Sequence, residues 1–320
     1  MALKGERVGG FVLDRRLART VEGELWKARD AAGRVAAVRL FYEPEWAELA
    51  AAAGPPEPFS HPLVAEEFAW SAETRPPFRA RAFIDGRSLA ELLEHSPRLP
   101  LGVAIPVALQ LARALEALHG KGLVHLDLRP DNVWLDAEGR LALTDRQNRL
   151  LHVGLVGRLF ARTERNALET ALRLRMRPYL APEAQRGGSY TETPGPERDM
   201  FALGVLLYRV LTGQLPSVID PRYPSRFDKR IPKVFDEVVL GCIERRVRAR
   251  LPDARGLGER LCEGWRRAGF ELDVRRPPSA WVVATPWRAT APDPRSASGM
   301  FRRWLAGGSG TRQPPTTVGE

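Results

Sequence analysis

Cysteine, lysine and long hydrophobic runs are scarce in this chain of 320 residues. Its two cysteines are too few for a disulfide framework or a cysteine-based metal cluster, which indicates a reducing, cytoplasmic setting. The longest apolar stretch, 201–208, is far shorter than the about 20 residues of a membrane helix, so we expect no membrane span. The N-terminal residues lack the apolar segment of a secretory signal.

Acidic residues are too few to balance the basic ones, and the net charge is +10. Arginine supplies nearly all of the 49 basic residues, and it is spread along the chain among 39 acidic residues. A basic chain can bind nucleic acid or acidic membranes when its charge is clustered. Because the charge here is dispersed, we interpret it as a solvated surface and expect no nucleic-acid partner.

Strand patterns come first along the chain. Residues 11–42 alternate between apolar and polar side chains in the manner of three antiparallel strands, with a turn at 31–34. A short helix is predicted at 43–53, and the pattern of 63–84 indicates further strands. This part of the sequence therefore predicts a small unit rich in sheet.

Helix patterns follow from Ser88. Ser88 and Glu91 have the spacing of a capping box, which marks the beginning of a helix. Residues 103–119 and 200–213 are apolar on all sides, as is typical of buried helices. The second of these helices is predicted to end at Gly213.

This order of strands and helices predicts an α+β fold with two lobes. We expect a small antiparallel β-rich lobe at about 8–85 and a larger helical lobe at about 86–268. Residues 275–320 are rich in Pro, Gly and Arg without periodicity, so they are predicted to be a disordered tail. Within that tail, 299–306 is a short basic and aromatic patch that could dock a partner or touch a membrane.

Polar residues gather in one short loop between apolar segments. Asp127, Arg129 and Asn132 lie within six positions, and Asp145 ends a short predicted strand farther along. Carboxylate and amide oxygens that converge at strand ends suit Mg2+, and an arginine beside them suits a phosphoryl group. The plainer alternative is a polar loop held by turns of its own side chains.

Residues 125–132, HLDLRPDN, resemble the catalytic loop H-R-D-L-K-P-x-N of eukaryotic-type protein kinases. LALTD at 141–145 resembles the strand that leads into the D-F-G motif, and YLAPEA at 179–184 resembles the A-P-E region. Residues 199–216 resemble the helix that carries a buried aspartate in that family. The bacterial serine/threonine kinases are the most similar, and the resemblance implies a bilobal protein-kinase-like domain over 8–268.

The resemblance assigns the chemistry to four residues. Asp127 would be the base that accepts the proton of a substrate hydroxyl, and Asn132 and Asp145 would hold Mg2+ with ATP. Arg129 would stand near the transferred phosphate, in place of the usual lysine.

The resemblance also implies structural roles for three charged residues. Arg250 takes the place of the family's arginine that pairs with the A-P-E glutamate, here Glu183. Asp199 corresponds to the buried aspartate of the helix. Buried charges of this kind must be paired.

The phosphate end of the site departs from the family pattern. Of the spaced glycines that let backbone N–H groups approach phosphates, only Gly23 is present. Aligning the third strand with V-A-I-K places Ala37 at the alanine and Arg39 at the lysine, and a guanidinium is bulkier than an ammonium. The glutamate that pairs with that lysine would be Glu48, or Glu45 as the next candidate.

Further departures surround the metal site. Arg146 and Gln147 replace the Phe and Gly of D-F-G, and an arginine cannot be buried in an apolar slot without a partner. Leu126 replaces the arginine of H-R-D, and Arg81 aligns with the residue at the back of the adenine pocket. Lys27 is a candidate replacement for the missing lysine, and the alternative is a solvated surface lysine.

These departures predict a pseudokinase that binds a protein partner, with binding of ATP and Mg2+ weakened or lost. The alternative is an active, atypical serine/threonine kinase that transfers the γ-phosphate to a protein hydroxyl with Asp127 as base. A third reading keeps the fold and applies another chemistry to a nucleotide. The arginine-rich stretch 146–178 is our candidate partner surface, and its alternative is a partly helical surface loop.

Overall fold

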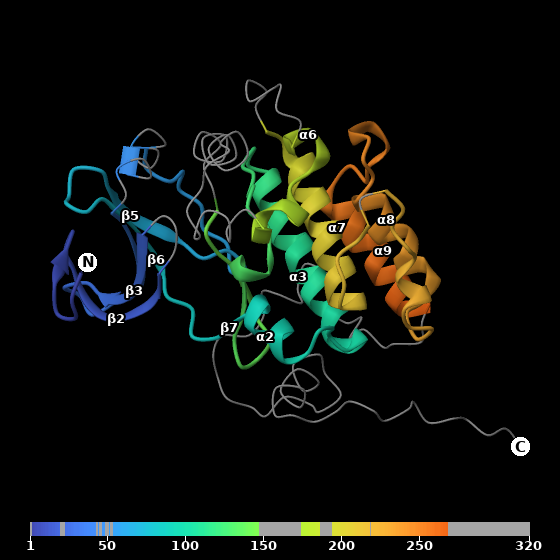
Figure 1. Cartoon of the computed structure of the whole chain (residues 1–320), viewed down its shortest axis with the longest axis horizontal. Helices are drawn as coiled ribbons and strands as arrows, with labels where there is room; N and C mark the ends of the chain where they lie inside the picture. The colour runs from blue at the N-terminus through green and yellow to red at the C-terminus, as the bar shows by residue number, and fades with distance from the viewer. Residues whose placement is uncertain are drawn as a thin grey trace, which may run out of the picture.

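The computed structural model describes most of the two predicted lobes. The described residues are 2–19, 23–42, 44, 47, 48, 51, 54–146, 174–185, 194–217 and 219–267. The helix expected at 43–53 lies mostly outside them, and so do the tail at 275–320 and most of the arginine-rich stretch. Figure 1 shows a sheet at one side of the molecule and a group of helices at the other.

The N-terminal lobe is a six-stranded antiparallel sheet in the order β1-β2-β3-β4-β6-β5. Its strands are β1 (Arg7–Val8), β2 (Phe11–Arg19), β3 (Gly23–Arg29), β4 (Val35–Phe41), β5 (Glu67–Ser71) and β6 (Phe78–Ala82). The three antiparallel strands predicted within 11–42 are confirmed. One face of the sheet packs Phe11, Trp26, Val38 and Phe78 into a small apolar core. The alternate residues of β4 and β6 lie on the other face, where they line the cleft between the lobes.

Helices form the core of the C-terminal lobe. They are α2 (Leu89–His95), α3 (Leu101–His119), α6 (Pro182–Gln185), α7 (Pro196–Thr212), α8 (Lys233–Cys242) and α9 (Ala254–Arg267). The capping box at the start of α2 is confirmed, because Ser88 and Glu91 exchange hydrogen bonds. The end of α7 at Gly213 is also confirmed, with that glycine in the left-handed conformation at φ 79°.

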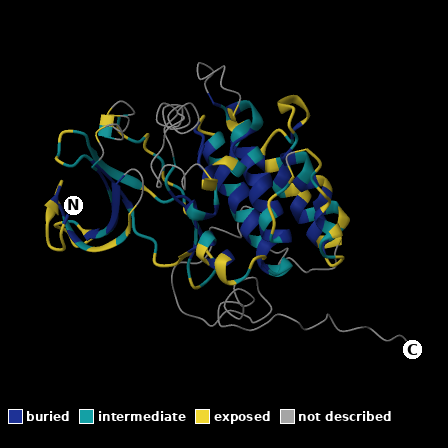
Figure 2. Ribbon diagram, viewed as in Figure 1, coloured by how far each residue is buried: buried dark blue, intermediate teal, exposed yellow. Residues whose placement is uncertain are grey.

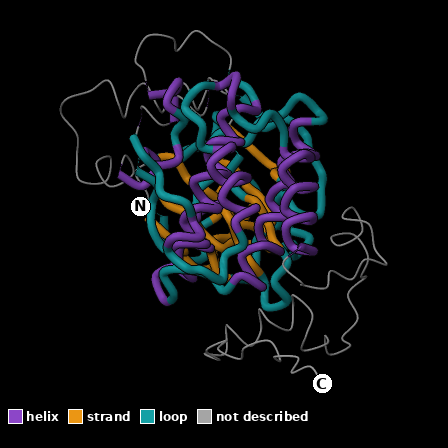
Figure 3. The backbone as a smooth tube through the Cα atoms, turned by 90° about the vertical axis from the view of Figure 1, so that its right-hand side faces the viewer, coloured by secondary structure: helices purple, strands orange, loops and turns teal. Residues whose placement is uncertain are grey.

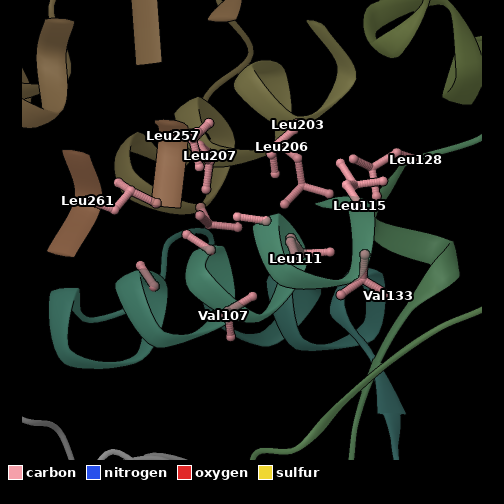
Figure 4. Packing of buried hydrophobic residues seen from close by; sticks show 14 of the residues in the cluster. Val107, Leu111, Leu115, Leu128, Val133, Leu203, Leu206, Leu207, Leu257 and Leu261 are labelled. Atoms are coloured by element: carbon pink, nitrogen blue, oxygen red, sulfur yellow. The ribbon is translucent and has the colours of Figure 1, made fainter. Parts of the chain in front are cut away.

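The buried helix α3 lies at the centre of this lobe, where it packs against α7 and α9. Figure 4 shows Leu111 of α3 facing Leu206 and Leu207 of α7, and all three side chains are at most 1% exposed. Figure 2 shows the same helices as mostly buried, with exposed residues toward the periphery. By length and composition alone α3 could cross a membrane, but it serves here as the core helix of the lobe.

A second, three-stranded sheet lies where the lobes meet. It consists of β7 (Arg87–Ser88), β8 (Val133–Leu135) and β9 (Leu141–Leu143). The backbone of Leu143 bonds to both Leu63 and Ala65, so the N-terminal part of the chain is joined directly to β9. Figure 3, turned by 90°, shows helices in front of the strands. Residues of the loop before β8 and of the loop after β9, namely Asp127, Arg129 and Asp145, line the same cleft as β4 and β6 of the large sheet.

Candidate active site

The loop that carries Asp127 is anchored to α7 by Asp199. The carboxylate of Asp199 is 1% exposed and accepts hydrogen bonds at 2.7 Å from the backbone N–H groups of His125 and Leu126. It also meets Nε2 of His119 at 2.9 Å. Burial alone would raise the pKa of Asp199, but the hydrogen bond and positive charge of His119 lower it overall. The structural role that the resemblance implied for Asp199 agrees with these contacts.

His125 joins the loop to the end of β9. Its side chain is fully buried, and Nδ1 accepts a hydrogen bond from the backbone N–H of Asp127 at 3.2 Å. Nε2 must then carry the proton, which it donates to the carbonyl of Thr144 at 3.0 Å. Burial lowers the pKa of His125 to about 4, so the ring is neutral at pH 7.

The three residues predicted to carry catalysis lie together. Nε of Arg129 donates to Oδ1 of Asp127 at 2.9 Å, and Nδ2 of Asn132 donates to Oδ2 of Asp127 at 2.8 Å. Asn132 also bonds to the backbone carbonyl of Asp127. Nη1 of Arg129 also forms an ion pair with Oδ2 of Asp131 at 2.9 Å. Both carboxylate oxygens of Asp127 therefore already accept hydrogen bonds from within its own loop.

Asp145, the predicted metal ligand, faces two arginines of the N-terminal lobe. Nη2 of Arg39 lies 3.3 Å from its Oδ1, and Nε and Nη2 of Arg81 lie 3.3 and 3.4 Å from Oδ1 and Oδ2. The hydroxyl of Thr144 donates to Oδ2 at 3.1 Å. Burial alone would raise the pKa of Asp145, but the charges of Arg81 and Arg39 hold it well below its usual range. Asp145 is therefore an ionised carboxylate whose partners are guanidinium groups.

The cleft between the lobes is small and lined by charged residues. Its open volume is about 50 Å3, against about 300–1,000 Å3 for pockets that bind small molecules. The lining residues include five arginines and three acids: Arg39, Arg79, Arg81, Arg129, Arg146, Glu67, Asp127 and Asp145. Long side chains thus fill much of the space that the resemblance assigns to ATP.

The predicted residues of the sheet take different places. Ala37 and Arg39 of β4 line the cleft. Gly23 has a φ of 147°, and a Cβ there would lie 1.9 Å from the carbonyl oxygen of Leu40, so contact between strands requires glycine at this position. Glu48 is exposed, and among the described residues Arg39 forms an ion pair with Asp145. The other candidate, Glu45, lies outside the described residues.

Lys27 lies on the sheet face of Ala37, its partner in the β3–β4 register. Its ammonium group is 4.4 Å from the centre of the Phe83 ring. This half-buried contact differs from the solvated lysine that was one of the two expectations. The replacement role remains a prediction.

Arg146, in place of the D-F-G phenylalanine, is not buried in an apolar slot. Its side chain is half-buried, and Nη2 donates to the carbonyl of Glu57 at 2.7 Å. The chain leaves Asp145 with a φ of 57°, a left-handed conformation that few non-glycine residues adopt. The different path expected beyond this point, from the missing Phe and Gly, lies outside the described residues.

The ion pair predicted between Glu183 and Arg250 is present. The two side chains form a bidentate pair at 2.7 and 3.0 Å, and Arg250 also donates to the carbonyls of Glu197 and Glu244. The Arg250 side chain is 1% exposed. This pair connects α6 to the segment before α9.

We did not predict from the sequence that Arg81 and Glu67 belong to one cluster of charged residues in the cleft. Arg81 was placed beside the adenine pocket, but its contact with Asp145 was not foreseen. Glu67 of β5 lies opposite Arg81 in the strand register; its Oε2 is buried without a hydrogen-bond partner, and burial raises its pKa. A signal was available: charged residues in short strands that are otherwise apolar must find partners when the strands are buried.

The described arrangement does not fit Mg2+ at Asp145. A carboxylate offers about four lone-pair positions, and those of Asp145 face four donor groups from Arg39, Arg81 and Thr144. Among the residues that the structure describes, no group of three or more His, Cys, Asp or Glu could hold a metal ion.

Comparison with known proteins identifies the family. Residues 77–242, just over half of the chain, match the family model of the protein kinase domain. Serine/threonine-protein kinase pkn2 of Myxococcus xanthus is 37% identical over 134 residues, which are 42% of this chain and 15% of that protein. Serine/threonine-protein kinase PknA of Mycobacterium tuberculosis is 28% identical over 224 residues, 66% of this chain and 49% of that protein. The chain thus spans less than half of the length of either relative.

A solved structure has the same fold. The PknI kinase domain of Mycobacterium tuberculosis superposes with a TM-score of 0.61 at 21% identity, over 82% of this chain and 99% of that domain. The predicted bilobal α+β fold is therefore confirmed, and bacterial serine/threonine kinases are among the relatives. On the matches of sequence and fold together, the chain belongs to the protein kinase family.

Proposed function

We propose that this chain is a pseudokinase, a kinase-fold module that binds a protein partner and transfers phosphate weakly or not at all. The observation that carries the proposal is the ion pairing of Asp145 with Arg39 and Arg81. The residue that should hold metal and nucleotide is engaged by cations of the protein itself. The small volume of the cleft supports the same conclusion.

Thermal melting with ATP, with and without Mg2+, tests this proposal. A ligand at about 100 times its Kd stabilises the folded state by about 2.7 kcal/mol, which raises the Tm of a domain of this size by about 5–10 °C. We expect no Mg2+-dependent rise up to millimolar ATP, and no transfer of labelled phosphate to the chain or to a general protein substrate. A rise that requires Mg2+, together with phosphate transfer, would overturn the proposal.

An active kinase is the second candidate, because one part of the site has the arrangement that catalysis needs. Asp127 and Asn132 are both buried and are joined by two hydrogen bonds within their loop. If transfer of phosphate is observed, the variant Asp127→Ala should abolish it, since Asp127 would accept the proton of the hydroxyl. Transfer that survives in this variant would exclude Asp127 as the base.

The partner surface belongs to the same proposal. Arg175 is 57% exposed in its side chain and pairs with Asp131 of the catalytic loop, and Arg177 lies two residues farther on. We expect an acidic or phosphorylated protein segment to bind here. Charge reversal at Arg175 and Arg177 should abolish capture of the partner in pull-down experiments, whereas reversal at the distant, exposed Arg230 should not. We place this activity in the cytoplasm, where the two buried thiols would stay reduced.

A further inference from the structure

We propose that Arg81 is the residue that excludes Mg2+ from this kinase fold, because its guanidinium group occupies Asp145 as a built-in cation. The inference rests on the proposed function and deepens it by naming the determinant. Arg81 aligns with the back of the adenine pocket, whereas Arg39 aligns with the lysine of V-A-I-K.

Arg81 makes the more extensive contact with Asp145. It approaches both carboxylate oxygens, through Nε at 3.3 Å and Nη2 at 3.4 Å, whereas the contact of Arg39 runs through Nη2 at 3.3 Å. A guanidinium that presents two N–H groups to one carboxylate fixes its orientation as well as its charge. The side chain of Arg81 is 7% exposed and that of Arg39 is 17% exposed, so water competes less for the first pair.

The sheet holds Arg81 in this position. On β4 its register partner is Ala37, whose small side chain leaves the guanidinium room to cross the face of the sheet. Nη1 donates to the carbonyl of Ala82 at 3.2 Å, which anchors the third nitrogen. Although Glu67 is the register partner on β5, the carboxylate that Arg81 bonds is Asp145 of the other lobe. Arg81 therefore acts between the lobes, and not only within its sheet.

The chemistry explains why a metal would be excluded. The family has a cation at position 39, and here Arg39 contacts Oδ1 of Asp145. This contact by itself leaves Oδ2 open to a metal ion. The second cation, Arg81, reaches Oδ2 as well and brings positive charge to the place where a divalent ion would bind. Like charges at this distance repel, and the effect is stronger in a partly buried cleft than in water. Removal of Arg81 should therefore release Asp145 for Mg2+.

The test is a gain of function in the full chain. The variant Arg81→Met keeps an unbranched apolar side chain in place of the aliphatic part of arginine and removes the charged guanidinium group. We expect it to gain a rise of several degrees in Tm with ATP that requires Mg2+, and to melt lower than the wild type when no ligand is present. The matched control is Arg79→Met, since Arg79 lies on the same strand and lines the same cleft, but its guanidinium bonds to the carbonyl of Gly54. The control should show no Mg2+-dependent rise.

A folded Arg81→Met protein without any Mg2+-dependent rise would overturn the inference, and an equal gain in Arg79→Met would show that cleft charge in general excludes the metal. If Arg81→Met does not fold, the variant Asp145→Asn provides the test. A Tm that falls below that of the wild type by the same amount in EDTA and in Mg2+ supports the inference, because the lost partners of the carboxylate are then arginines. A Tm unchanged in EDTA but lowered relative to wild type in Mg2+ would overturn it. A wild-type chain that binds Mg2+-ATP and transfers phosphate would instead overturn the proposed function itself, so the two failures are distinguishable.

Discussion

Replacing Asp199 with asparagine should loosen the loop that carries Asp127. The carboxylate now accepts one backbone N–H on Oδ1, from Leu126, and faces the N–H of His125 and Nε2 of His119 on Oδ2. An asparagine side chain can keep one oxygen acceptor, but its amide nitrogen must then face the donors on the other side. At least one buried N–H group of the loop or ring would lose its acceptor.

The contacts set the expected size of the effect. A hydrogen bond to a charged group contributes about 1.5–3 kcal/mol, and removing one partner from a buried charged set costs about 3–5 kcal/mol. Leu126 also has a φ of 66°, a left-handed conformation that its anchor must maintain against a cost of about 1–3 kcal/mol. We therefore expect Asp199→Asn to lower the free energy of unfolding by about 3–5 kcal/mol, or the Tm by about 6–20 °C.

Thermal melting and amide hydrogen exchange together measure this effect. At least one of the backbone N–H groups of His125 and Leu126 should exchange much faster in the variant, because asparagine offers an oxygen acceptor on only one side. Asp131→Asn is the matched control: it changes the same group in the same loop, but Asp131 is 21% exposed and pairs with Arg129 and Arg175. Its cost should stay below about 1 kcal/mol. Exchange that is unchanged at both His125 and Leu126 in Asp199→Asn would refute the reasoning.

Three further predictions concern the stability of the helical lobe. Burial lowers the pKa of His125 to about 4, whereas the same ring in the unfolded chain takes up its proton near pH 6.5. Because the unfolded state therefore binds more protons between these pH values, the free energy of unfolding should fall by about 3 kcal/mol from pH 6.5 to pH 4. Urea denaturation should show a flatter pH profile in His125→Asn, and identical profiles would contradict this. Glu183→Ala should cost about 3–5 kcal/mol because it leaves Arg250 buried and unpaired, and adding Arg250→Met should recover part of the loss; strict additivity of the two changes would argue against the pair. Leu111→Ala should cost about 2–5 kcal/mol in the same assay, since Leu111 is fully buried, and a loss below 1 kcal/mol would exclude the packing shown in Figure 4.

Short-range features of the site followed from the sequence. Asp127, Arg129 and Asn132 lie within six positions, so a tight loop of any detailed shape brings their side chains close together. The capping box at Ser88 and the end of α7 at Gly213 depend on contacts over three or four residues, which the sequence displays directly. The pair of Glu183 and Arg250 spans 67 positions, and it was predicted only because several motifs resemble those of a known family in the same order.

The sequence alone determined the family of the chain, its two lobes and the loop that carries Asp127, because these depend on apolar periodicity and on local spacing. The tertiary structure decided what Asp145 does. Its partners Arg39 and Arg81 are 106 and 64 positions away, and five arginines line the same cleft. Spacing and composition cannot indicate which of these guanidinium groups reaches the carboxylate, because that depends on the register of β4 with β6 and on how the sheet faces the loop after β9.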